Sequence, residues 1–181
     1  EPGANVLISA PSDGSGVGIT TTDNAGNNGY TNSDYTSNFG GTSSATPLVS
    51  GVVALMLEAN SNLTWRDVQE ILVESARKND PNDSGWNTNG AGYEFNHKYG
   101  FGVVDAGHAV DLATSWTNLD PEVNLSSGTI TVSQTVPDNE PNNPVISSYT
   151  VSDSIRVESV DVIFDADHNY RSDLDVTLIS P

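Results

Sequence analysis

The stretch FGGTSSATPLVSGVVALML, residues 39–57, decides the fold of this chain because it joins a glycine turn to a long apolar segment. We predict a helix over residues 43–58. Its apolar residues are spread around the axis rather than along one stripe, which predicts burial on most sides. Gly51 lowers helix propensity, and we expect it to permit a close crossing with a neighbouring element.

The serine at the start of this helix is a candidate for chemistry. Gly40 and Gly41 allow a tight turn from a strand into the helix. Ser43 would then lie where unpaired backbone N–H groups and the positive end of the helix dipole meet. A hydroxyl there can act as a nucleophile while its own N–H binds an oxyanion. The alternative is that Thr42 and Ser43 are ordinary helix-capping residues.

The remaining pattern predicts a helical region followed by a β region. Residues 4–10 indicate a short buried strand, and residues 20–38 and 79–97 indicate polar loops. A second helix begins after Thr64, with Asp67 completing a capping box, and a third follows a cap at Asp105. Four alternating segments after residue 124 predict strands. We therefore expect one domain over residues 1–116, a linker over 117–124 and a second domain over 125–181.

Composition excludes several classes of function. The chain has 181 residues, 24 acidic and six basic side chains and a net charge of -18, which opposes binding to nucleic acid or anionic membranes. It has no cysteine, so disulfides, thiolate zinc sites and thiol nucleophiles are excluded. The apolar run over residues 52–57 is too short to span a bilayer. The N-terminus shows neither an initiator Met nor a signal-peptide pattern, and we interpret the chain as a piece of a longer protein.

Several motifs resemble one protease family. GTSSATP, residues 41–47, matches the G-T-S-x-[SA]-x-P signature around the nucleophile of subtilisin-like serine proteases. LEANSNLTWRDVQEILVESA, residues 57–76, resembles the kexin/furin-like proprotein convertases within that group. KYGFGVVDAGHAVDLA, residues 98–113, is similar to the end of their catalytic domain. DADHNYRSDLDVTLISP, residues 165–181, is similar to part of their P domain, also called the homo B domain.

The resemblance implies a fold and an activity. It implies the C-terminal portion of an α/β subtilisin-like catalytic domain, followed by an incomplete all-β, jelly-roll-like P domain. It also implies a secreted or cell-surface endopeptidase with Ser43 as the nucleophile and a protein or peptide as substrate. In this family the catalytic Asp and His and the oxyanion Asn precede the Ser. We therefore expect them in a missing N-terminal part of the same catalytic domain, and we expect the fragment alone to be inactive.

The three histidines all follow Ser43, which is the wrong order for a subtilisin-type base. We expect His97 in a loop, His108 as a surface or packing residue of the third helix, and His168 in a turn of the β region. The order found in α/β-hydrolases would permit His97 or His108 as the base. That alternative requires a G-x-S-x-G turn, which the sequence lacks.

Calcium is the ion that the composition favours, because loop carboxylates and amides are hard oxygen ligands. One candidate group is Asp23 and Asp34 with Asn24, Asn27 and Asn28, although a plain turn region rich in Asn and Asp explains them equally well. The candidates in the β region are Asp138, Asp165, Asp167 and Asp173. These sites leave a second functional hypothesis open, in which the chain is an inactive protease-like scaffold with a calcium-dependent β module that binds proteins or surfaces.

Overall fold

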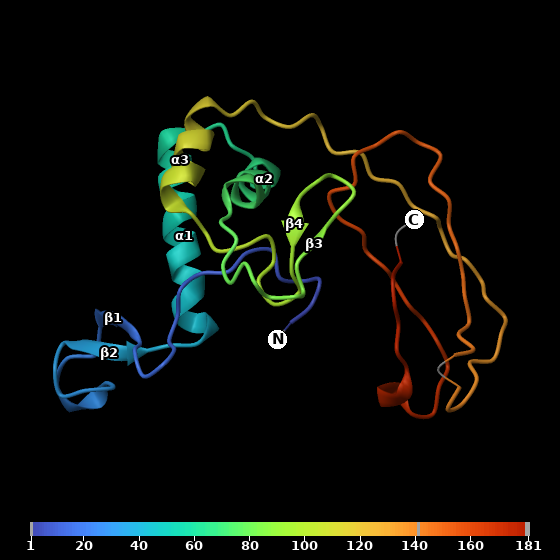
Figure 1. Cartoon of the computed structure of the whole chain (residues 1–181), viewed down its shortest axis with the longest axis horizontal. Helices are drawn as coiled ribbons and strands as arrows, with labels where there is room; N and C mark the ends of the chain where they lie inside the picture. Colours follow the sequence, from blue (N-terminus) through green and yellow to red (C-terminus); the bar gives the residue numbers. More distant parts are fainter. Residues whose placement is uncertain (1, 141, 180–181) are drawn as a thin grey trace. The chain divides into compact units, whose positions relative to one another are not determined.

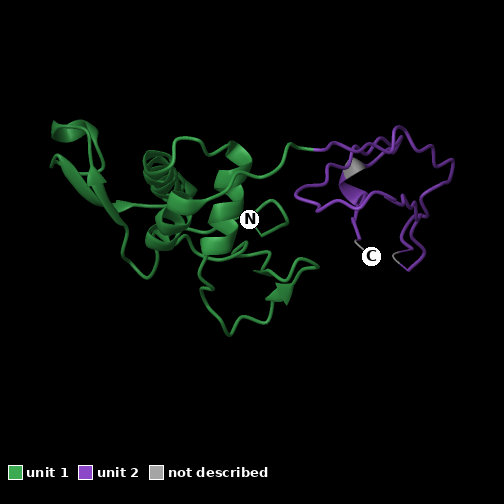
Figure 2. Cartoon of the chain, turned by 90° about the horizontal axis from the view of Figure 1, so that it is seen from above, with its two compact units in different colours: residues 1–122 green, residues 123–181 purple. Residues whose placement is uncertain are grey.

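The computed structural model describes residues 2–140 and 142–179. The chain divides into two compact units, residues 1–122 and residues 123–181, which are coloured separately in Figure 2. The division falls inside the range that the sequence indicates as a linker. All of the α-helices that the structure describes lie in the first unit, and the order of elements along the chain is shown in Figure 1.

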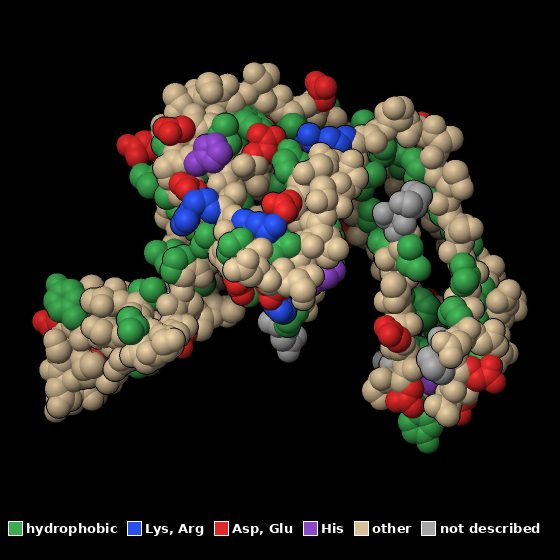
Figure 3. Space-filling model, viewed as in Figure 1, with side chains coloured by type: hydrophobic (Ala, Val, Ile, Leu, Met, Phe, Trp, Pro, Cys, Tyr) green, Lys and Arg blue, Asp and Glu red, His purple; other side chains and the backbone are tan. Residues whose placement is uncertain are grey.

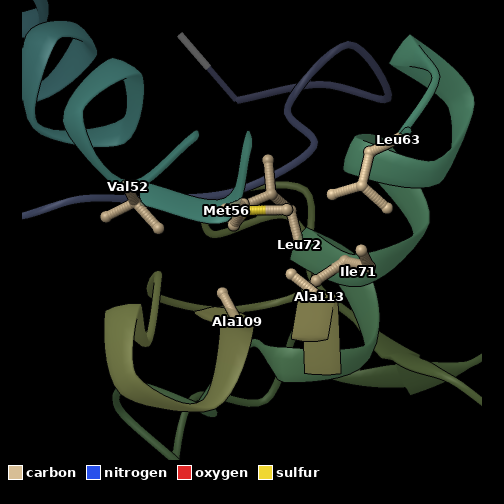
Figure 4. Close-up of a cluster of buried hydrophobic side chains, with 7 residues drawn as sticks. All are labelled: Val52, Met56, Leu63, Ile71, Leu72, Ala109 and Ala113. Carbon is tan, nitrogen blue, oxygen red and sulfur yellow. The ribbon is translucent and has the colours of Figure 1, made fainter. Parts of the chain in front are cut away.

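Helix α1, Thr42–Ala59, crosses helix α3, Ala106–Ser115, and helix α2, Trp65–Ser75, also packs against α3. Figure 4 shows the side chains that meet between these helices. The core is small and consists of Val52, Met56, Leu63, Ile71, Leu72, Ala109 and Ala113. Ala109 and Ala113 are one turn apart on the buried face of α3, and both are fully buried. Because alanine side chains are short, this face allows close approach of α1.

Two expectations for α1 are wrong. The helix is not buried on most sides, since Leu48 and Leu55 are 39% and 49% exposed. Gly51 does not mark a crossing, because a Cβ atom placed there would meet nothing within 4 Å. Packing on α3 covers one face only, and among the described residues nothing covers the opposite face. By length and composition α1 could cross a membrane, although the apolar run over residues 52–57 is by itself too short, and in the structure α1 packs on α3.

The predicted capping of α2 and α3 is confirmed. Thr64 accepts a hydrogen bond from the N–H of Asp67, and the Asp67 carboxylate accepts one from the N–H of Thr64, so the capping box is complete. The carboxylate of Asp105 likewise accepts a hydrogen bond from the N–H of His108 at the start of α3. These bonds satisfy N–H groups that a helix leaves unpaired in its first turn, and they fix where each helix begins.

The first of the two predicted loops forms a hairpin. Strands β1, Ile19–Thr22, and β2, Tyr35–Phe39, pair antiparallel, and the short 3-10 turn η1, Gly26–Asn28, lies between them. The register shifts between Ile19 and Thr21, which marks a bulge. The hairpin matters for the site because β2 ends directly before the turn into α1.

The second predicted loop also contains paired segments. Strands β3, Asn87–Thr88, and β4, Glu94–Phe95, form a two-residue antiparallel pair. The predicted strand at residues 4–10 is reduced to an isolated bridge between Ser9 and Val103, and Val103 also forms a bridge with Arg77. Gly100 and Gly102 have positive φ angles, and a Cβ atom at either would overlap the backbone of Leu7 or Arg77. Only glycine permits this close approach.

The second unit does not confirm the predicted strands. Its described residues contain one short 3-10 turn, η2, Arg171–Asp173, and no strand. The alternating apolar side chains, shown in green in Figure 3, remain exposed; Ile163 is 97% exposed. Extended segments that gain neither a hydrogen-bonded neighbour nor a covered face do not close a sheet. Ser180, at the end of the fourth predicted strand, lies outside the described residues.

Candidate active site

The turn between β2 and α1 carries the candidate nucleophile. Gly41 is the N-cap of α1 and has φ 74° and ψ -172°, a conformation that strongly favours glycine. The helix therefore begins at Thr42, and Ser43 lies in its first turn. The Ser43 side chain is exposed, and no hydrogen bond between described residues uses its Oγ or its N–H. These unpaired groups are what an attacking hydroxyl and an oxyanion donor require.

Residues 12 and 13 hold this turn from the other side. The carboxylate of Asp13 accepts a hydrogen bond from the N–H of Gly41. The hydroxyl of Ser12 donates to the carbonyl of Gly41, with 2.7 Å between the oxygen atoms. Hydrogen bonds from the Gly41 N–H and the Ser12 hydroxyl lower the pKa of Asp13, so it is ionised at neutral pH. A Cβ atom on Gly40 would overlap this carboxyl group.

Ser44 connects the turn to the body of the unit. Its side chain is only 2% exposed, and its hydroxyl donates to the carbonyl of Gly41 at 2.9 Å. The Ser44 and Ser12 hydroxyl oxygens are 2.8 Å apart. The neighbouring serines of α1 therefore differ in role: Ser44 is fixed in the turn, whereas Ser43 points to solvent.

The histidines occupy the places expected from the sequence, and no described hydrogen bond links any of them to Ser43. His97 lies in the loop after β4 and packs edge-on against Phe95. His108 is exposed in the first turn of α3. The Nδ1 atom of His168 lies 2.7 Å from the carbonyl oxygen of Tyr170, within a local turn.

Asp23 and Asp34, the proposed calcium ligands near the hairpin, make hydrogen bonds within the turn, and calcium binding by them stays a prediction. Both carboxylate oxygens of Asp23 already accept backbone N–H groups, from Asn24 and Thr31, each at 2.8 Å. The backbone carbonyl of Asp34 accepts a hydrogen bond from the N–H of Asp23. This is the turn arrangement that short polar side chains form by themselves. Over residues 2–140 and 142–179, no three acidic or histidine side chains gather as a metal site.

The acidic residues of the second unit are not brought together either. Asp138 lies in a turn, Asp173 belongs to η2, and Asp165 and Asp167 lie in the irregular segment before it. Calcium binding by these residues therefore stays a prediction.

A pocket of about 240 Å³ lies away from Ser43, between the end of α2 and the β3–β4 hairpin. The phenol of Tyr93 lines it and donates to Glu70 and Glu74, at 3.2 Å and 3.0 Å. Burial, together with these two carboxylates, raises the pKa of Tyr93 to about 12. The raised pKa keeps the Tyr93 hydroxyl protonated at neutral pH, and we assign the chemistry to the α1 turn instead.

The sequence did not identify the residues that hold this turn. The stretch PSDG, residues 11–14, indicates a turn, but no local pattern shows that its serine and aspartate bind the backbone of Gly41, 29 and 28 positions further along. The role of Asp67 beyond the capping box was also missed. Its carboxylate binds residues 116–119 of the segment predicted as helix end and linker.

Comparison with known proteins gives a consistent family. Residues 2–102 match the Subtilase family. PC3-like endoprotease variant B of Hydra vulgaris is 41% identical over 150 residues, covering 81% of this chain and 21% of that protein. Protease KEX1 of Kluyveromyces lactis is 39% identical over 185 residues, covering 97% and 23%. Human furin is 36% identical over 143 residues, covering 78% and 18%. The chain thus spans about a fifth of the length of these relatives.

Two solved structures are similar in fold to part of this chain. A serine protease of Aeromonas sobria aligns with a TM-score of 0.56 at 30% identity, covering 58% of this chain and 24% of that one. The same protease in complex with its chaperone aligns with a TM-score of 0.62 at 26% identity, covering 67% and 27%. These findings agree with the signature around Ser43. The chain belongs to the subtilase family of subtilisin-like serine proteases, and within that family it groups with the kexin- and furin-like proprotein convertases.

Proposed function

We propose that this chain supplies the nucleophile of a serine endopeptidase, and that the nucleophile is Ser43. One observation carries the proposal: Ser43 lies in the GTSSATP signature, in the first exposed turn of α1, and its hydroxyl and N–H are unpaired among the described residues. A serine that only capped the helix would use its side-chain oxygen to accept an N–H group of the first turn.

The proposed reaction is acyl transfer through Ser43. The Ser43 oxygen attacks the scissile carbonyl of a peptide, and its proton passes to a histidine base. The negative charge that develops on the carbonyl oxygen is stabilised by the Ser43 N–H at the positive end of α1, a donor of a kind worth roughly 3–4 kcal/mol. The tetrahedral intermediate then collapses: the scissile C–N bond breaks, and the histidine gives its proton to the departing amine. Water attacks the acyl-Ser43 ester, which releases the new carboxylic acid and regenerates the Ser43 hydroxyl.

The base, its orienting aspartate and the asparagine that completes the oxyanion hole come, in this proposal, from a part of the catalytic domain that precedes residue 1. Two observations support this. None of His97, His108 or His168 is hydrogen-bonded to Ser43, and the relatives are about five times as long as the region they share with this chain. The isolated chain is then inactive.

The open face of α1 supports the same arrangement. Leu48 and Leu55, which are seven positions apart and therefore share a side of the helix, are exposed, and Leu57 is exposed on another side. Exposed apolar side chains on this scale mark a surface that another part of a protein covers. We propose that the preceding part of the catalytic domain packs here, which would restore the burial on most sides that the sequence of α1 predicts.

The substrate proposed is a protein or peptide, and the location is the secretory pathway, the cell surface or the extracellular space. The relative named endoprotease supports the substrate class, and the location follows from the family resemblance of the sequence motifs. The second unit corresponds in this proposal to the beginning of a P domain. The charge of -18 suits substrates with basic residues, because opposite charges steer association.

The test is substitution of Ser43→Ala in the full-length protein. We expect the rate of peptide cleavage to fall at least about 10⁴-fold and labelling by a fluorophosphonate probe to disappear, since the attacking oxygen is removed. The melting temperature should stay nearly unchanged, because Ser43 makes no described hydrogen bond. The matched control is Ser50→Ala, also exposed on α1, where the hydroxyl donates only to the carbonyl of Thr46.

Labelling that survives Ser43→Ala would disprove the assignment of the nucleophile. A full-length protein that neither cleaves peptides nor reacts with the probe would instead favour the inactive scaffold. In that case the sequence before residue 1 should lack the histidine or the aspartate.

A further inference from the structure

We propose that Ser12 and Asp13 are positioning residues for the nucleophile, and that they act by holding both sides of the Gly41 residue from which α1 begins. We call this pair the Ser12–Asp13 clamp. The proposal rests on the assignment of Ser43 and extends it to residues that lie 30 positions earlier in the chain.

The turn at Gly41 lacks a side-chain cap of its own and needs support from elsewhere in the chain. Gly41 combines φ 74° with ψ -172°, and no side chain caps α1. Glycine loses more conformational freedom on ordering than any other residue, so this turn is the least restrained point between β2 and α1. Any rotation at Gly41 moves Ser43, which is two residues further along.

The Ser12–Asp13 clamp restrains both polar groups of Gly41. Asp13 accepts the N–H, and Ser12 donates to the carbonyl at 2.7 Å. The carbonyl also accepts the hydroxyl of Ser44 at 2.9 Å. Because both polar groups of Gly41 are hydrogen-bonded, rotation of its backbone is restrained. The turn therefore holds the Ser43 oxygen and N–H in one orientation.

The Ser12–Asp13 clamp also contacts the first turn of α1. The oxygens of Ser12 and Ser44 are 2.8 Å apart, and Ser44 is buried beside Ser43 in the first turn. The Gly41 carbonyl has two lone pairs and lies within hydrogen-bond distance of both hydroxyls, while the single proton of Ser12 is shared between this carbonyl and the Asp13 carboxylate, 3.1 Å away. Asp13 is ionised at neutral pH, and a charged acceptor makes the stronger hydrogen bond to Gly41.

The clamp should affect catalysis and not substrate affinity. Neither residue takes part in the proposed acyl transfer, whereas displacement of a nucleophile by about 1 Å lowers reaction rates by up to about 100-fold. Loss of either hydrogen bond should therefore lower kcat and the rate of acylation, with KM nearly unchanged. A purely structural role would change the melting temperature and the fraction of active protein, but not the rate per active site.

The experiment uses four variants of the full-length protein in two matched pairs. Ser12→Ala and Asp13→Ala remove a hydrogen-bonding group, while Ser12→Thr and Asp13→Asn keep the hydroxyl or an acceptor oxygen. Fluorophosphonate titration counts active sites, and the rate constant of labelling and the kcat for a peptide are measured per site. We expect roughly a tenfold loss for each alanine variant, and rates within about twofold of wild type for Ser12→Thr and Asp13→Asn.

The outcomes separate this inference from the function on which it rests. Wild-type rates per site in both alanine variants would overturn the clamp while leaving Ser43 as the nucleophile. Equal losses in Asp13→Asn and Asp13→Ala would also overturn it, because the amide keeps the acceptor. Probe labelling that does not require Ser43 would overturn the proposed function first. Asp13 is exposed, so its variants test the proposal even if Ser12→Ala does not fold.

Discussion

At the scale of single residues, Asp67 has the largest structural role among the described acids. It is fully buried, and its carboxylate accepts five hydrogen bonds, from Thr64 N–H and hydroxyl, Trp116 Nε1, Asn118 Nδ2 and Leu119 N–H. Burial by itself raises the pKa of Asp67, but the hydrogen bonds from Thr64, Leu119 and Trp116 outweigh it and hold the pKa at about 2. A carboxylate bound by this many donors stays charged inside the protein.

This gives a prediction for acid stability. Because the folded pKa of about 2 lies below the ordinary value of 3.8, Asp67 stabilises the fold above pH 3.8 and loses that contribution as the pH falls to about 2. We expect Asp67→Asn to lower the free energy of unfolding at pH 7 by roughly 2–4 kcal/mol, because donors remain buried without an acceptor. The difference from wild type should shrink between pH 4 and pH 2, as measured by thermal unfolding.

The control for this prediction is Asp111→Asn, an exposed carboxyl group on α3. It should change stability by no more than about 0.5 kcal/mol at either pH. A difference between Asp67→Asn and wild type that is equally large at pH 7 and pH 2 would show that the charge of Asp67 does not contribute.

At the scale of elements, the first unit depends on the crossing of α1 and α3. Met56 is fully buried between Ala109 and Ala113 on one side and α2 on the other, as Figure 4 shows. The core described here has seven buried apolar residues, so few side chains can move to fill a cavity if Met56 is shortened. The same crossing fixes the direction of α1, and the N-terminal turn of α1 carries Ser43.

We therefore expect Met56→Ala to lower the free energy of unfolding of the full-length protein by about 2–5 kcal/mol, as cavity formation in a core does. Met56→Leu has nearly the same volume and should cost less than about 1.5 kcal/mol. Chemical denaturation of both variants measures this difference. Equal losses would mean that the side chain is not packed as described.

At the scale of the whole molecule, the main features are the negative charge and the division into two units. Each unit is strongly acidic, and the acidic side chains in Figure 3 are scattered rather than gathered. The junction is more ordered than a linker, because Asn118 and Leu119 bind Asp67 and the carbonyl of Asp120 receives Arg66. The first part of the predicted linker is therefore docked on the start of α2.

Calcium is the prediction that belongs to this scale. We expect chelation to lower the melting temperature of the full-length protein, because a cation bound only by the folded state stabilises it by mass action. The shift should persist in Asp23→Asn, since both oxygens of Asp23 are already occupied by backbone N–H groups. A melting temperature that does not respond to a chelator in wild type would disprove calcium binding.

The sequence by itself determined the local features of this protein. The helix starts at Thr64 and Asp105 and the glycine turn before Ser43 follow from neighbouring residues, because capping and positive φ angles are decided within a few positions. Motif resemblance likewise identified the family and the candidate nucleophile.

The tertiary structure alone decided what depends on distant contacts. It showed that α1 is covered on one face, that the 20–38 segment forms a hairpin, and that Ser12 and Asp13 hold Gly41. It also left the segments of the second unit unpaired, although their alternation predicts strands. A strand needs a partner and a covered face, and a hydrogen bond across the chain needs the fold that brings its ends together. A local sequence pattern specifies neither the partner strand nor the fold.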